Sequence, residues 1–298
     1  MTESSGSADA SKTATPQKKR DVTISNVTFM SCMGVIGAAY VLFIVAMLAA
    51  DTWYMAENSL DAAREGAWHT VLFENPIVAA LADRKIRYSI WLSLVSCTLT
   101  AVLSLLVAVP AGYLLSRHEF RGKRLLDSVL DIPIVLPPLV VGLSLLILFQ
   151  YPPFVWLARD VVYQLPAVVI AQFSVASAFA VRTMKSTFDH IDPRSEQVAV
   201  TLGCSRSQAF GLVVLPDASR GMMTAFTLAW ARSLGEFGPL LVFAGATRMK
   251  TEVLSTSVFL ELNVGNIEAA VAVSLIMILA AVTVLVITRR WGLRDVGI

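Results

Sequence analysis

Charged residues are scarce in this sequence. Lys, Arg, Asp and Glu make up 15% of its 298 residues, whereas an ordinary soluble domain carries about 25%. Hydrophobic residues make up 56%, the mean hydropathy is +0.67, and the net charge is only +2. This composition excludes a disordered chain and a nucleic-acid-binding domain. It indicates a protein whose solvent is largely lipid.

Cysteine and histidine are also few. The three cysteines, Cys32, Cys97 and Cys204, are odd in number and have spacings that fit no metal motif, so we interpret them as free thiols. The three histidines are scattered through polar stretches and form no cluster. The sequence therefore excludes a disulfide scaffold, and we expect no metal site.

Motifs for nucleotide binding and catalysis are missing as well. A P-loop needs Gly, four residues, and then Gly-Lys-Ser/Thr. The one Gly-Lys pair, Gly122-Lys123, is followed by Arg124, and Arg117 stands where the first glycine belongs. No nucleophile elbow or pair of carboxylates lies at a plausible depth in an apolar stretch. We therefore expect that this chain is not an enzyme and holds no cofactor.

Long apolar runs are what the sequence does contain. A helix needs about 20 mostly apolar residues to cross a membrane, and six runs approach or exceed that length. They are residues 29–50, 88–115, 132–150, 165–181, 222–246 and 269–288. The first is too long for the h-region of a signal peptide, which spans about 7–15 residues, so we favour an uncleaved helix. The predicted fold is an all-α, polytopic membrane bundle of six transmembrane helices.

Basic residues near the ends of these runs predict the orientation of the bundle. Sixteen Lys and Arg residues fall on the side that holds both chain termini, and seven fall on the other side. Both termini are therefore predicted to be cytoplasmic in a multi-pass protein of the cytoplasmic membrane. The cluster Arg84, Lys85 and Arg87 argues against this orientation, because it adjoins the second run on the outer side.

The chain is predicted to have two parts. Residues 1–28 are polar and lack apolar periodicity, so we expect a disordered cytoplasmic tail. Residues 29–298 form the transmembrane domain, with a core at 87–290 and a cytoplasmic segment at 182–221. The sequence assigns no role to the outer loop between Asp51 and Arg87.

The cytoplasmic segment predicts two short helices. Asp192 can cap the first, and Gly203 suits the left-handed residue that ends it. Ser205 and Gln208 have capping-box spacing for the second, which we expect Pro216 to end. Such a helical knob is either a plain soluble connector or a docking element for a cytoplasmic partner.

The knob resembles the signature of the membrane-spanning permeases of binding-protein-dependent ABC importers. That signature is Glu-Ala-Ala, three residues, Gly, nine residues, Ile, one residue, Leu-Pro. The matching positions, with the spacing intact, are Gln197, Val198, Ala199, Gly203, Val213, Leu215 and Pro216. In that family the segment is the coupling helix that sits in a cleft of the ATPase subunit. Because Gln197 replaces the family's Glu, Glu196 is the neighbouring candidate for a charged contact.

Two further stretches, residues 131–142 and 231–238, are similar to the sulfate/molybdate/tungstate branch of these permeases. The resemblance implies the permease subunit of an ATP-driven importer, with molybdate or tungstate as the first choice of oxyanion and sulfate as the next. It also implies a separate ATPase that holds ATP and Mg²⁺, an extracytoplasmic binding protein, and a second permease chain, expected to make a homodimer. The sequence does not decide the oxyanion or exclude a heterodimer.

Arg232 and Glu236 are the ionisable pair within an apolar run. They lie four residues apart, so they share one helix face, and a charge at mid-membrane depth costs about 2.5–3.5 kcal/mol on insertion scales. The pair either locks helices together or contributes Arg232 to an anion path, and both interpretations stay open.

Prolines and glycines in the third and fifth runs predict bends or close helix contacts. They lie either at a fixed packing kink or at a hinge lining the pathway. The candidates are Pro133, Pro137, Pro138, Gly142, Gly235 and Gly238.

Two other classes of protein compete with the importer. An ATP-independent secondary transporter or channel would want more ionisable residues at the midplane and often repeated halves, and no repeat is apparent. A membrane-anchored structural protein would not need the capped cytoplasmic knob.

Overall fold

The computed structural model describes residues 17–64 and 76–294 of the chain. The chain has two units, residues 1–57 and 58–298. Every regular element within the described residues is helical, which agrees with the predicted all-α class.

The first unit consists of the greater part of α1 (Gln17–Arg64). Its apolar stretch Phe29–Glu57 is long enough to cross a membrane, which confirms the first predicted run. The helix already begins at Gln17, inside the tail for which disorder was predicted, because extending an existing helix costs far less than starting one. The remainder of that tail, residues 1–16, lies outside the described residues.

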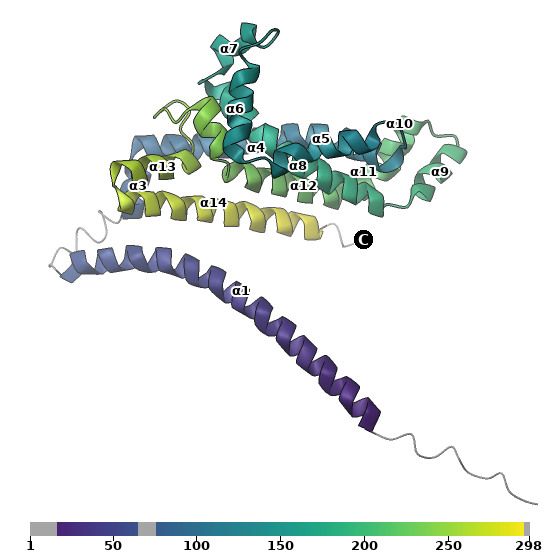
Figure 1. Ribbon diagram of the computed structural model, residues 1–298, viewed down its shortest axis with the longest axis horizontal. Helices are drawn as coiled ribbons and strands as arrows, with labels where there is room; N and C mark the ends of the chain where they lie inside the picture. Colours follow the sequence, from purple (N-terminus) through teal and green to yellow (C-terminus); the bar gives the residue numbers. More distant parts are fainter. Residues whose placement is uncertain (1–16, 65–75, 295–298) are drawn as a thin grey trace, which may run out of the picture. The chain divides into compact units, whose positions relative to one another are not determined.

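The second unit is built around four helices: α4 (Arg84–Arg117), α8 (Leu165–His190), α12 (Ser219–Leu234) and α14 (Ile267–Arg294). The helices α4, α8 and α12 pack against one another, and α14 packs against α12 (Figure 1). Small residues line these contacts; Ala101, Ala108, Ala176 and Ala180 are fully buried. Such residues let helix backbones approach closely where lipid supplies no hydrophobic driving force.

Four described helices are long and apolar enough to span a membrane. They are Phe29–Glu57 within α1, then α4, α8, and Ile267–Thr288 within α14. They confirm the first, second, fourth and sixth predicted runs.

The third run is a bent pair of helices. The helices α5 (Lys123–Val135) and α6 (Pro138–Leu148) meet at 112°. The break falls at Leu136 and Pro137, because a proline disfavours helical geometry in the residue before it. Pro133 lies inside α5 without ending it, so the expected bend belongs to Pro137 and Pro138. If the pair is one span, the described residues hold five spans.

The fifth run does not form one helix. The helix α12 ends at Leu234, and a π-helical turn, η2 (Leu240–Ala244), follows after a break. The break covers Gly235, Glu236 and Phe237, since glycine favours helix poorly, and Gly238 and Pro239 begin the next helical stretch, where a proline needs no N–H partner. The predicted count of six continuous helices is therefore not confirmed.

Shorter elements gather at the two ends of the helix layer. One end carries α9 (Pro193–Thr201), α10 (Arg206–Ala209), the π-helical η1 (Phe210–Val214) and α11 (Leu215–Asp217). Figure 1 shows α9 and α10 at this end, and α3 (Pro76–Ala82) with α13 (Leu254–Val264) at the opposite end. The helices α6 and α7 (Val155–Val161) stand away from the layer. Because α8 extends to His190, the first nine residues of the predicted cytoplasmic segment continue this helix.

Candidate functional site

The knob at residues 192–217 begins as its sequence predicts. Asp192 caps α9, and its carboxylate accepts the backbone N–H of Arg194 at 2.9 Å. Gly203 follows α9 with φ of +99°, a conformation that suits glycine. Ser205 and Gln208 form the predicted capping box: the Ser205 N–H donates to the Gln208 side chain at 2.9 Å, and the Gln208 N–H donates to Ser205 Oγ at 3.3 Å.

The second half of the knob departs from the prediction at Pro216. The helical course continues from α10 through η1 into α11, and Pro216 lies in the first turn of α11. Proline is tolerated there because the π-helical turn η1, in which the Leu215 N–H bonds to the Phe210 carbonyl five residues back, already interrupts the α-helical ladder before Pro216. Pro216 therefore does not end the helix that Ser205 begins.

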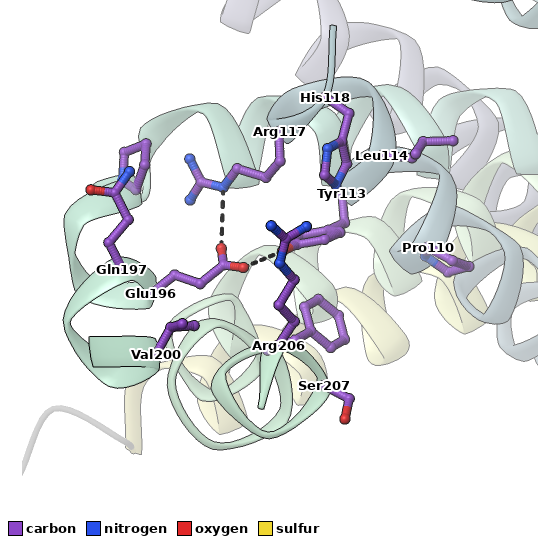
Figure 2. A pocket seen from close by; sticks show the side chains of 12 residues that line it. Pro110, Tyr113, Leu114, Arg117, His118, Glu196, Gln197, Val200, Arg206 and Ser207 are labelled. Atoms are coloured by element: carbon purple, nitrogen blue, oxygen red, sulfur yellow. Dashed lines mark hydrogen bonds and ion pairs between the residues drawn. The ribbon is translucent and has the colours of Figure 1, made fainter. Parts of the chain in front are cut away.

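Glu196 of α9 joins the knob to the end of α4. The Tyr113 hydroxyl donates to Glu196 Oε1 at 2.5 Å, and Arg117 Nε lies 4.0 Å from Glu196 Oε2. Arg117 also donates to the Ile191 carbonyl at 2.8 Å, just before α9 begins. Figure 2 shows the Glu196 carboxylate between Tyr113 and Arg117, with Arg206 beside the tyrosine. These residues border a cavity of about 820 Å³ between α4 and the knob.

Aromatic rings extend the same junction. The Tyr113 ring meets Phe210 of η1 edge-on at 4.7 Å between centroids, and Phe188 of α8 at 5.6 Å. Aromatic pairs favour this T-shaped arrangement. Tyr113 therefore contacts α8, α9 and η1 from its place on α4.

The residues of the matching signature have different environments. Ala199 is buried, Val213 and Leu215 are half-buried, and Gln197, Val198, Gly203 and Pro216 are exposed. The neighbouring Leu202 and Leu212 are 81% and 71% exposed. Val198, Leu202 and Leu212 are the three most exposed apolar residues of the knob, ahead of Val200. Glu196 by contrast faces its own bundle.

The bends and the charged pair come together at a second place. Arg232 Nη1 lies 2.6 Å from Glu236 Oε2, and the Arg232 guanidinium lies over the Phe179 ring at 5.7 Å from its centroid. The Glu236 side chain is 1% exposed and that of Arg232 is 28% exposed. Both border a cavity of about 420 Å³. Its other lining residues are Pro137, Pro138, Leu139, Gly235, Phe237 and Gly238.

Two glycines make this convergence possible. A Cβ on Gly238 would stand 2.7 Å from the Cβ of Pro138, and one on Gly142 would stand 2.8 Å from the Cα of Pro239. A Cβ on Gly235, by contrast, would have its nearest neighbour, the Ala231 carbonyl oxygen, 3.8 Å away. The first turns of α6 and the helical stretch that leads into η2 therefore touch through Gly142 and Gly238. Pro133 is not part of this contact.

An ion cluster that the sequence did not indicate ties α5 to α8. Asp127 accepts from Arg182 at 3.1 Å and from Lys185 at 2.9 Å, and Arg182 also binds Asp131. Tyr113 was missed as well, although it is a lone hydroxyl near the end of an apolar run. The signal in both cases is a polar side chain at a helix end, but its partner lies more than fifty residues away.

At the opposite end of the layer, Glu252 is buried beside Arg248. Ser257 donates to Glu252 Oε1 at 2.7 Å, Arg248 Nη1 lies 3.7 Å from the same oxygen, and Glu252 Oε2 has no hydrogen-bond partner among the described residues. Burial raises the pKa of the Glu252 carboxyl above its ordinary value. Arg248 also pairs with Glu261 at 2.8 Å. Among the described residues, no group of His, Cys, Asp and Glu is arranged to hold a metal ion.

Comparison with known proteins places the geometry in context. Residues 104–292 match the family described as binding-protein-dependent transport system inner membrane component. The chain is 33% identical over 214 residues to the sulfate transport system permease protein CysT of Escherichia coli (strain K12), covering 69% of this chain and 77% of that protein. It is 34% identical to the putative molybdenum transport system permease protein YvgM of Bacillus subtilis (strain 168), over 59% of this chain and 80% of that one.

Among solved structures, a chain in the crystal structure of a bacterial alginate ABC transporter in complex with an alginate pentasaccharide-bound periplasmic protein shares the fold. Its TM-score is 0.62 at 13% sequence identity, over 86% of this chain and 95% of that chain. At this identity the likeness concerns the fold alone.

Proposed function

Since the chain belongs to the family of binding-protein-dependent transport system inner membrane components, we propose that it is the permease subunit of an ATP-driven importer for a tetrahedral oxyanion. Molybdate or tungstate is the first choice and sulfate the next, since similar permeases are named for each of these anions. The chain acts as a multi-pass protein of the cytoplasmic membrane with both termini in the cytoplasm.

The capped knob is the observation that supports this proposal most directly. Its backbone ends are satisfied by Asp192, Ser205 and Gln208, yet Val198, Leu202 and Leu212 remain exposed. Exposed apolar residues on a well-ordered element are typical of a protein contact. We assign this face to a cytoplasmic ATPase, which holds ATP and Mg²⁺ and whose closure moves the knob. The residues of the coupling segment are Glu196, Gln197, Val198, Ala199, Gly203, Val213, Leu215 and Pro216, of which Glu196 faces the bundle and not the ATPase.

The cavity beside Arg232 is our candidate for the pathway lining. Arg has five N–H donors, and the Arg232 side chain borders this cavity and is 28% exposed beside Glu236. Because Glu236 neutralises the charge, an oxyanion there would meet hydrogen-bond donors without a strong net attraction. Transport needs such a site, since an ion must leave as readily as it arrives. The pair thus locks the helix break and lines the path. An extracytoplasmic binding protein delivers the anion, and a second copy of the chain completes the pathway.

Reconstitution tests the proposal. The chain, purified with the ATPase that accompanies it, is placed in vesicles with ATP on the knob side, and the binding protein with radiolabelled molybdate or sulfate on the other. We expect uptake that requires both ATP and the binding protein. Uptake by the chain alone without ATP would instead support a secondary transporter or channel and refute the importer.

A further inference from the structure

The contact between α9 and α4 is partly shielded from water. The side chains of Arg117 and Glu196 are 10% and 16% exposed, and the Tyr113 hydroxyl donates to the Glu196 carboxylate at 2.5 Å. A hydrogen bond to a carboxylate is about twice as strong as one between neutral groups. Glu196 is therefore held by the bundle.

The end of α4 is in turn fixed on α8. A Cβ on Gly112, the neighbour of Tyr113, would stand 2.8 Å from the Cβ of Met184 and 2.8 Å from the Lys185 backbone nitrogen. Two helices that touch this closely cannot slide apart locally without losing packing. A displacement of Tyr113 therefore moves α4 and α8 together.

The two kinds of contact at Tyr113 respond differently to force. Ring packing against Phe210 and Phe188 resists compression steeply, but dispersion contacts weaken within an ångström of separation. The bond to Glu196 also resists separation, because breaking it leaves a shielded carboxylate without its tyrosine donor. Packing thus transmits a push on the knob, and the Tyr113–Glu196 bond transmits a pull.

We propose that Tyr113 is a positioning residue that couples movement of α9 to α4 and α8 through its hydroxyl. The inference rests on the proposed function, because the force on α9 comes from the ATPase. It assigns to Glu196 a role inside the permease, whereas the resemblance offered it as a charged contact to the ATPase.

The test compares Tyr113→Phe with Tyr88→Phe in the full reconstituted complex. The first variant keeps the ring and loses the hydroxyl at the knob. The second loses a hydroxyl at the other end of α4, where Tyr88 donates to the Lys250 carbonyl at 3.1 Å. For Tyr113→Phe we expect the anion transported per ATP hydrolysed to fall by about fivefold or more, a typical size for coupling between sites. For Tyr88→Phe we expect this ratio to stay at the wild-type value.

Two variants of Glu196 separate the hydrogen bond from the charge. Glu196→Ala removes the acceptor and should lower the ratio as Tyr113→Phe does. Glu196→Gln keeps an acceptor for the tyrosine and should retain most of the coupling. The ATPase should co-purify with every variant in wild-type amount.

An unchanged ratio in Tyr113→Phe or in Glu196→Ala would overturn the inference. Transport and hydrolysis that fall in proportion leave this ratio unchanged, and they would indicate a merely structural defect. If the wild-type complex itself shows no ATP-dependent uptake, the proposed function is what fails, and the variants are not needed to see it.

Discussion

A methyl group on Gly112 would stand 2.8 Å from the Cβ of Met184, so α4 and α8 touch almost backbone to backbone. Gly112→Ala should therefore force the helices apart. Overpacking a tight contact costs about 1–3 kcal/mol, and we expect a lower thermal unfolding midpoint in detergent. Gly211→Ala is the matched control, because in the described part of the chain no atom beyond its own helical turn lies within 4 Å of the Cβ position at Gly211. Equal midpoints for the two variants would contradict the close approach.

Substitution by alanine should destabilise the protein at Gly238 but not at Gly235. Gly238→Ala meets Pro138 and the Leu139 backbone nitrogen at under 3 Å, whereas Gly235→Ala meets nothing nearer than 3.8 Å. We expect Gly238→Ala to lower the free energy of unfolding by about 1–3 kcal/mol. The free energy of unfolding of Gly235→Ala should match that of the wild type. Thermal unfolding of both purified variants measures this, and a destabilised Gly235→Ala would show that Gly235 is needed as a hinge.

The pair Arg232 and Glu236 should behave as a unit. Arg232→Met leaves Glu236 buried without its cation, and removing one partner of a buried pair costs about 3–5 kcal/mol. The double variant Arg232→Met with Glu236→Leu leaves no uncompensated charge, so it should recover much of that loss. A double-mutant cycle on unfolding free energies provides the measurement. Additive losses would mean that the two side chains do not interact.

Composition predicted the continuous helices of this fold better than the interrupted ones. The runs now in α1, α4 and α14 are long and free of charged residues, so their length identifies them. The run now in α8 is shorter and contains Gln172, Ser174 and Ser177, so its length identifies it less clearly than the other three. The other two runs are interrupted at Pro137 and Gly235, and the sequence does not show which of its prolines and glycines ends a helix. Pro133, by contrast, lies inside α5, which continues on both sides of it.

The knob and the Tyr113 junction show the same division. The capping box between Ser205 and Gln208 is local in sequence, so its spacing alone predicted it. The partners Tyr113 and Glu196 lie 83 residues apart. Only the packing of α4 against the knob brings them together, and no spacing rule reports that contact.

Glu252 predicts a dependence of stability on pH. Burial raises the pKa of its carboxyl in the folded protein, so folding favours the protonated form. The stability that this group contributes is present at low pH and is lost as the pH rises through the folded-state pKa. Glu252→Gln keeps an acceptor for Ser257 without the charge, and should be more stable than the wild type at the upper end of the range.

Unfolding midpoints between about pH 4 and pH 8 test this, since the range spans ordinary carboxyl pKa values and raised ones. Glu119→Gln is the control, because the Glu119 side chain is 88% exposed. If Glu252→Gln and the wild type keep the same difference at every pH, the buried carboxyl does not govern the dependence.

Leu202 offers the sharpest test of the docking face, because it is the most exposed apolar residue of the knob. Covering a leucine side chain contributes about 1.5–3 kcal/mol, and Leu202→Asp would place a charge in the same contact. We expect the ATPase that co-purifies with the wild-type chain to bind this variant at least about tenfold more weakly, since about 1.4 kcal/mol is a factor of ten. Leu202→Met conserves the apolar volume and should bind as the wild type does. Titration of the purified ATPase against each variant in nanodiscs gives the affinities.

The unfolding midpoint of Leu202→Asp should not change, because the side chain is 81% exposed. Normal binding by Leu202→Asp would exclude this residue from the ATPase contact, whereas a lowered midpoint would mean that Leu202 supports the knob itself.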